Sequence, residues 1–232
     1  MLPPIKSLAI VFFSALILRL LLLLVSSYHP EGWLYPDSHM YMQIAEGILE
    51  NGEYVMKDGN QYHPVTDRLP LYPLYLALFF ALFGNSLIWP LLGQAILGAV
   101  TCVVIGLISR EFNKNAFIVG GILAAFNLNL IAHDALIMTE TLFIFFFTIH
   151  LYVTLQLLKT PSYGRVVCSS LCLGFAVITR PILIYFCPLI AIFVTTALII
   201  RRWRWVPAIS YGVLLMLGPS ILTSPLYLRN YL

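Results

Sequence analysis

Long apolar runs separated by short polar segments dominate the chain. A helix needs about twenty apolar residues to cross the roughly 30 Å hydrocarbon core of a bilayer. Runs that approach this length are predicted to be seven membrane-spanning helices, over residues 8–27, 87–109, 116–132, 141–158, 166–179, 181–200 and 206–223. The pattern therefore predicts an all-α fold, a polytopic membrane helix bundle, which we treat as a single domain over residues 1–232.

An eighth apolar stretch, residues 69–83, is shorter and begins with Pro70 and Pro73. If it rests at the membrane interface and the N-terminus is cytoplasmic, the inside loops carry eight Lys and Arg residues and the outside four. If it crosses, three lie inside and nine outside, which the positive-inside rule disfavours. We therefore expect seven spans, and an outer first loop over residues 28–86 that contains this interfacial helix.

Composition supports a membrane protein and excludes other classes. Hydrophobic residues make up 60% of the 232 residues and charged residues 10%, and the mean hydropathy is +0.91. A soluble domain carries about 25% charged residues. The net charge of +3 lies in the loops and forms no basic patch, so no nucleic-acid partner is expected. The four cysteines fall within apolar runs and form no Cys-x-x-Cys pair.

The first loop contains a segment with helical period. Apolar residues recur at 40, 41, 44, 45, 48 and 49 with polar residues between them, and Asn51-Gly52 follows. This predicts a juxtamembrane amphipathic helix over residues 37–50. Asp37 would lie in its first turn, where the helix dipole and free amides favour an ionised carboxylate that can accept a proton or simply cap the helix.

Further polar residues are expected on the same outer face. Arg68 precedes the interfacial helix at the depth of lipid headgroups, where a guanidinium can hold a phosphate or pair with Asp67. The short turn around Arg180, between two truncated apolar runs, is typical of a buried binding site. The remaining candidates are His133, Asp134, Glu140 and Arg229. Arg19 lies within the first span, where either a helix-helix hydrogen bond or a function would explain it.

Several of these segments together resemble the GT-C superfamily of membrane glycosyltransferases. The similarity is to the branch of dolichyl-phosphate-mannose protein mannosyltransferases and lipid A aminoarabinose transferases. It is carried by Pro-Asp-Ser-x-x-Tyr at 36–41, Arg-Leu-Pro-Leu-Tyr-Pro at 68–73, Met-Thr-Glu at 138–140, Thr-Arg-Pro at 179–181 and Pro-x-x-x-Arg-Asn at 225–230. The order and spacing of these pieces cover nearly the whole chain.

The resemblance implies transfer of a sugar from a polyprenyl-phosphate-linked donor to an acceptor hydroxyl on the outer face, with inversion. Asp37 would be the general base and Glu140 the second acid of the site, and these two are the residues that would hold a divalent metal ion if one is bound. The residues implied to bind substrate or lipid phosphate are Arg68, Arg180, Arg229, Tyr41, Tyr72, His133 and Asp134. An Asp-Glu pair of some relatives is here Asp37-Ser38, and relatives carry further spans beyond the length of this chain.

Two other functions fit the same residues. A non-enzymatic binder or flippase-like transporter of lipid-linked sugars would need paired polar groups in both leaflets or symmetric repeats, and neither is evident in the sequence. An accessory membrane subunit is the third interpretation. The sequence contains no Asn-x-Ser/Thr glycosylation site, which favours a bacterial cytoplasmic membrane over the secretory pathway.

Overall fold

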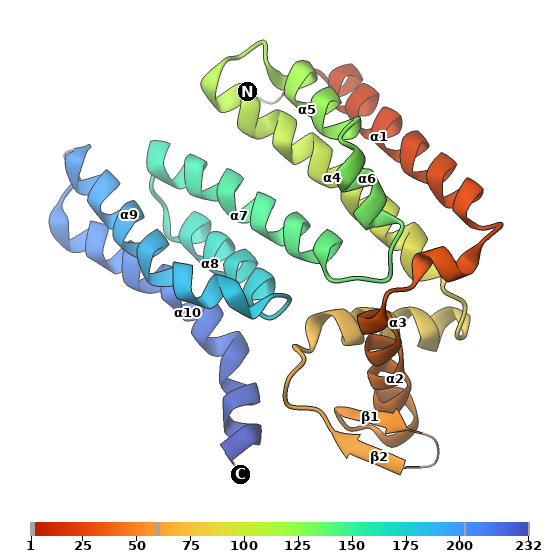
Figure 1. Cartoon of the computed structure of the whole chain (residues 1–232). Helices are drawn as coiled ribbons and strands as arrows, with labels where there is room; N and C mark the ends of the chain where they lie inside the picture. The colour runs from red at the N-terminus through yellow and green to blue at the C-terminus, as the bar shows by residue number, and fades with distance from the viewer. Residues whose placement is uncertain (1–2, 59–60, 202, 232) are drawn as a thin grey trace. The chain divides into compact units, whose positions relative to one another are not determined.

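The computed structural model describes residues 3–58, 61–201 and 203–231, and most of them are helical (Figure 1). They form two compact units, Met1–Leu142 and Phe143–Leu232. The all-α membrane bundle predicted from the sequence is confirmed. The single-domain interpretation stays a prediction, and each unit is described by itself.

The first unit packs three long apolar segments against one another. These are α1 (Ile5–Ser26), α4 (Ile88–Phe112) and a bent pair, α5 (Phe117–Ala125) and α6 (Leu128–Asp134), whose axes differ by 57°. Glycine allows the close approach, since a Cβ on Gly121 would lie 2.6 Å from the Val11 side chain. Helices in lipid pack through such small residues because there is no hydrophobic force between them.

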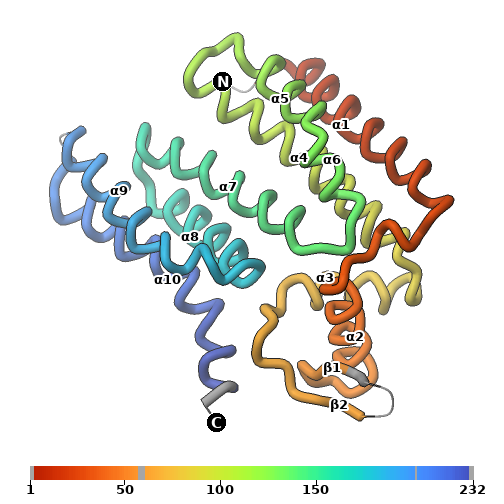
Figure 2. The backbone as a smooth tube through the Cα atoms, in the orientation of Figure 1, coloured from red at the N-terminus to blue at the C-terminus, as the bar shows by residue number. Residues whose placement is uncertain are grey.

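The second unit is built from the end of the chain (Figure 2). It contains most of α7 (Glu140–Lys159), followed by α8 (Tyr163–Val177), a 3₁₀ helix η2 (Pro181–Phe186), α9 (Cys187–Ile200) and α10 (Trp205–Tyr231). Helix α10 packs on α8 and α9. Gly218 fits against α8 because it has no side chain, and its N–H donates to Oγ of Ser170 at 2.7 Å.

Five helices of the described chain are long and apolar enough to cross a membrane, and the bent pair α5–α6 makes a sixth segment. Helix α8 has 15 residues, about 22 Å at 1.5 Å per residue, and does not reach the length of a full span. Helix α3 (Leu71–Phe83) is shorter still. A helical membrane bundle is therefore confirmed, whereas the count of seven spans and the interfacial position of α3 stay predictions.

The first loop contains the predicted amphipathic helix, together with a 3₁₀ turn and a hairpin that the sequence did not predict. Helix α2 (Pro36–Asn51) matches the amphipathic segment and ends at Gly52, whose φ of 72° is the left-handed conformation that glycine adopts freely. A 3₁₀ turn η1 (Pro30–Trp33) precedes it. An antiparallel hairpin, β1 (Val55–Asp58) and β2 (Gln61–Pro64), follows. Each strand has four residues, too few to show a clear alternation in sequence.

This loop is an integral part of the first unit. Tyr41 and Ala45 of α2, Tyr72 and Leu76 of α3 and Leu91 of α4 are buried in one hydrophobic cluster. The apolar face of α2 thus packs onto α3, while its polar face is left for the groups described below. The position of the polar residues of the loop is consequently fixed by side-chain packing.

Substitution of Gly47 tests how tightly the hairpin packs on α2. A Cβ at this position would lie 2.2 Å from the carbonyl oxygen of Val55 in β1. We expect Gly47→Ala to lower stability by about 1–3 kcal/mol, because the backbone must shift although alanine is the better helix former. Thermal unfolding in detergent would measure this, with Gly164→Ala as control, since a Cβ there meets nothing within 4 Å. A melting temperature equal to the wild type would contradict the close packing.

Candidate functional site

Asp37 lies in the first turn of α2, as predicted. Pro36 occupies the first helical position, and the helix start is closed by a capping box between Tyr35 and Ser38. The Asp37 side chain is 47% exposed, so a substrate can reach it. Its carboxylate is therefore held at the positive end of a helix and remains open to the outside of the unit.

Arg68 contacts Asp37 across the first loop. Its Nη2 donates to Oδ1 of Asp37 at 3.0 Å, and its Nη1 lies 3.8 Å from Oδ2 of Asp67. Among the described residues, the buried Nε of Arg68 has no hydrogen-bond partner. A guanidinium offers five N–H donors. The Arg68 side chain is 27% exposed, so a ligand would reach it through the exposed part of the side chain and not through the enclosed Nε.

Ser38 connects the start of α2 to the turn before α7. Its hydroxyl accepts from the N–H of Tyr35 at 2.8 Å and donates to the carbonyl of Ile137 at 2.7 Å, and the side chain is fully buried. The N–H of Ile137 in turn donates to the carbonyl of Trp33 at 2.9 Å. Glu140 begins α7 three residues later. Asp37 and Glu140 are thus brought to the same end of the first unit.

The structure explains why a serine stands at position 38, where the resemblance leads one to expect the second acid of an Asp-Glu pair. A second carboxylate at this buried position would face the carbonyl oxygen of Ile137, which also carries negative charge. A hydroxyl can donate to that oxygen, whereas an ionised carboxylate only accepts. Ser38 is a structural connection between two segments of the site.

Tyr41 and Tyr72 are next to each other and near Glu140. Their ring centroids lie 5.2 Å apart in an edge-to-face arrangement, and the Tyr72 hydroxyl donates to Oε1 of Gln94 at 2.7 Å. Burial, with smaller contributions from the neighbouring Tyr75 and from the negative charge of Glu140, raises the pKa of Tyr72 well above its usual range. Tyr72 therefore keeps its proton and acts as a hydrogen-bond donor at neutral pH.

Asp134 points into the protein. One carboxylate oxygen is 2.6 Å from Nε of Arg19, the other accepts from the Thr141 hydroxyl at 2.7 Å, and the Asp134 side chain is 6% exposed. The neighbouring His133 is half-buried. Arg19, whose place within the first span the sequence left unexplained, thus forms an ion pair between α1 and α6. A role of His133 or Asp134 in binding a ligand stays a prediction.

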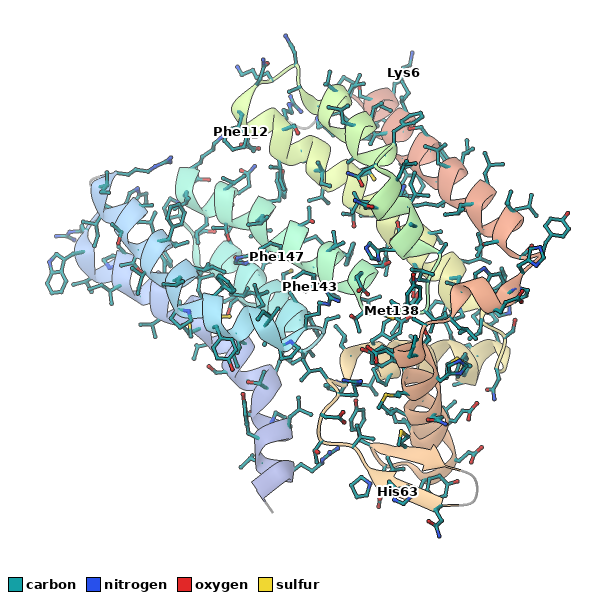
Figure 3. The ribbon with its side chains drawn as sticks, viewed as in Figure 1. Lys6, His63, Phe112, Met138, Phe143 and Phe147 are labelled. Atoms are coloured by element: carbon teal, nitrogen blue, oxygen red, sulfur yellow. The ribbon has the colours of Figure 1, made fainter. Side chains whose placement is uncertain are left out.

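Arg180 and Arg229 belong to the second unit. Arg180 precedes η2, and its guanidinium lies 5.9 Å from the ring centroid of Phe143, the residue that begins this unit (Figure 3). Arg229 is exposed in the last turn of α10. Their convergence with Asp37 stays a prediction.

No group of three or more His, Cys, Asp or Glu side chains suited to a metal ion occurs among the described residues. Asp37 and Glu140 would supply two carboxylates, and Asp37 already faces the cation Arg68. A divalent ion usually takes six or more oxygen ligands, although Mg²⁺ fills several of its positions with water. A divalent ion held by Asp37 and Glu140 therefore stays a prediction, and the chemistry below uses no metal.

The site geometry can now be compared with known families. A sequence model of the dolichyl-phosphate-mannose-protein mannosyltransferase family matches residues 63–226, well over half of the chain. The chain belongs to this family. It is a membrane glycosyltransferase of the GT-C type, which confirms the resemblance found in the sequence. No curated protein matches the chain. Arg68, Glu140 and Arg180 fall inside the matched residues, whereas Asp37 and Arg229 fall outside.

Sequence reasoning missed Gln94 and assigned no role to Ser38. Gln94 is fully buried, and its amide donates to the carbonyls of Asp134 and Leu136 at 3.2 and 2.7 Å. The available signal was a single amide side chain within the apolar run 87–109, because a polar group in a membrane helix requires a partner. Sequence alone could not name that partner.

Ser38→Ala tests the connection between α2 and the turn before α7. The substitution leaves the carbonyl of Ile137 and the N–H of Tyr35 without their bonds to the hydroxyl. We expect a loss of about 1–3 kcal/mol in stability and a fall in transfer activity. Thermal unfolding and a transfer assay would measure both. Ser14→Ala is the control, because its hydroxyl bonds to carbonyls of its own helix. Equal behaviour of the two variants would argue against this connection.

Proposed function

We propose that this chain transfers a sugar from a polyprenyl-phosphate-linked donor to an acceptor hydroxyl, with inversion at the anomeric carbon and Asp37 as the general base. The observation that carries the proposal is the contact between Asp37 and Arg68 at the start of α2. It sets a partly exposed base beside a partly exposed cation. Family membership supports sugar transfer as the reaction type.

The donor class follows from the kind of charge the site can hold. The sequence has no glycine-rich phosphate loop and no dinucleotide-binding motif. Arg68 lies directly before the apolar helix α3. The lipid chain of a phosphate bound by Arg68 could therefore contact the apolar surface of this helix. A lipid-linked phosphate suits this position better than a free nucleotide, and the name of the family, which includes dolichyl-phosphate-mannose, supports the same donor class.

The transfer step is a substitution at the anomeric carbon. The acceptor oxygen attacks this carbon while its proton passes to the Asp37 carboxylate, and the bond from the anomeric carbon to the phosphate oxygen breaks. The polyprenyl phosphate leaves with the bonding electrons, and attack from the opposite face inverts the configuration. Arg68 stabilises the charge that develops on the leaving phosphate.

Other residues would complete the site. Glu140, held near Tyr72, would bind a hydroxyl of the acceptor or the sugar. Tyr41 and Tyr72, which the resemblance also implies, are buried and would contribute through the packing behind the site. Arg180 and Arg229 would contact the lipid phosphate and His133 would bind substrate, as the family resemblance implies. The resemblance also implies Asp134, but its side chain is 6% exposed and engaged with Arg19 and Thr141, so we assign it no contact with the substrate. The acceptor would be a glycolipid, a polysaccharide or a protein.

The proposed location is the bacterial cytoplasmic membrane, with the N-terminus in the cytoplasm and the site on the outer face. The distribution of Lys and Arg among the loops supports this orientation, because eight lie in the predicted inside loops and four outside. A lipid-linked donor fits such a site, since nucleotide-activated sugars are not available outside the cell.

Asp37→Asn tests the role of the base. The amide keeps the size of the side chain but cannot accept the proton, so we expect transfer to fall by about 10²–10⁴-fold while the donor still binds. Transfer by the purified protein in lipid nanodiscs, with a polyprenyl-phosphate sugar as probe, would measure it. Asp67→Asn is the matched control, because Asp67 also faces Arg68 but lies 3.8 Å away. Unchanged transfer by Asp37→Asn would exclude Asp37 as the base, whereas wild-type protein that binds the donor but transfers no sugar would favour a lipid-linked-sugar binder or transporter.

The proposed orientation predicts opposite labelling of two loops. Gln61→Cys in the hairpin should react with a membrane-impermeant maleimide on intact cells, whereas Asn113→Cys, after α4, should react only after lysis. Both positions are exposed, and the wild-type protein controls for its own cysteines. Labelling of Asn113→Cys on intact cells would contradict the proposed orientation and, with it, the position of the site on the outer face.

A further inference from the structure

A buried ion pair lies beneath the candidate site and takes no part in the proposed chemistry. Arg19 of α1 and Asp134 of α6 meet at 2.6 Å, with their side chains 1% and 6% exposed. The other nitrogens of Arg19 also have partners, the carbonyl of Ala15 at 3.0 Å and the sulfur of Cys102 at 3.5 Å. The guanidinium is consequently fixed within the packed helices.

Such a pair is unfavourable to bury for stability alone. Removing two charges from water costs more than their attraction usually returns, and ionisable residues inside membrane helices are generally retained for a function. The surrounding helix is shaped to receive the pair. A Cβ on Gly98 of α4 would lie 1.9 Å from Oδ2 of Asp134 and 2.5 Å from Nε of Arg19.

The second oxygen of Asp134 connects the pair to the start of α7. It accepts from the hydroxyl of Thr141, the residue directly after Glu140. Gln94 holds the main chain of the same turn, through the carbonyls of Asp134 and Leu136, and also accepts from the Tyr72 hydroxyl. Apart from the bonds of Arg19 to Ala15 and Cys102, these polar bonds join the group to the turn that leads to Glu140 or to Tyr72 beside it.

We propose that Arg19, Gln94, Asp134 and Thr141, here called the buried anchor, are positioning residues that fix Glu140 and Tyr72 relative to the start of α2. The ion pair sets the end of α6, Thr141 sets the first turn of α7, and Gln94 joins both to α3. This inference rests on the proposed function, in that Glu140 belongs to the site. None of the four residues needs to touch the substrate.

Thr141→Val is the most selective test, because it removes the bond to Asp134 and leaves the ion pair in place. We expect kcat to fall about tenfold with the KM for the lipid-linked donor within about twofold, since a small displacement of a site residue costs rate while Arg68 is untouched. Asp134→Asn should produce a larger fall in the same direction. The control is Thr101→Val, a buried threonine of α4 whose hydroxyl bonds to the carbonyl of Leu97 in its own helix.

Two further measurements separate positioning from general stability. Amide exchange of residues 135–139 should be faster in Thr141→Val than in Thr101→Val. In a Glu140→Gln background, Thr141→Val should lower kcat by less than about twofold, because residues that act through one another are not additive. The proposal is overturned if Thr141→Val leaves both the exchange and kcat at wild-type values, or if its loss of kcat is undiminished in the Glu140→Gln background.

Failure of the proposed function gives a different pattern. If Asp37→Asn keeps full transfer, the assignment of the base is wrong, yet exchange at residues 135–139 still reports whether the anchor holds the turn. Transfer assays thus test the chemistry, and exchange tests the anchor.

Discussion

The connection between the first loop and the turn before α7 is the interaction on which the candidate site depends. Ser38 donates to the carbonyl of Ile137, and the N–H of Ile137 donates to the carbonyl of Trp33. These bonds join two segments about a hundred residues apart in the chain. Because the donors and acceptors are buried, the bonds cannot be replaced by water, and the two acids that they position stay at one end of the first unit.

Packing of apolar side chains gives this connection its rigidity. Helix α2 buries Tyr41 and Ala45 against α3 and α4, so the polar loop behaves as part of the membrane unit and not as a separate flexible segment. Asp37 and Arg68 remain at the edge of this cluster, where they are partly exposed. The result is a rigid apolar support with a partly exposed Asp37–Arg68 pair at its edge, as the proposed transfer requires.

The charged residues of the first unit fall into two groups, which differ in how far they are buried. Asp37 and Arg68 are partly exposed, which suits a reaction with a substrate. Arg19 and Asp134 are fully engaged with each other and with the surrounding helices, which suits a structural role. The same residue types therefore acquire different roles from burial and from the number of partners they already have.

The sequence by itself determined the membrane bundle, the amphipathic helix α2 with Asp37 in its first turn, and the family. These depend on hydrophobic period, helix-end signals and short motifs, which are local properties. Only the tertiary structure decided that Arg68 contacts Asp37, that Asp134 turns inward to Arg19, and that Ser38 and Gln94 hold the turn before Glu140. Those contacts join distant segments. A polar residue in an apolar run indicates that it has a hydrogen-bond partner, but the sequence does not show which residue that partner is. The hairpin was missed for a related reason, because its four-residue strands depend on packing against Gly47.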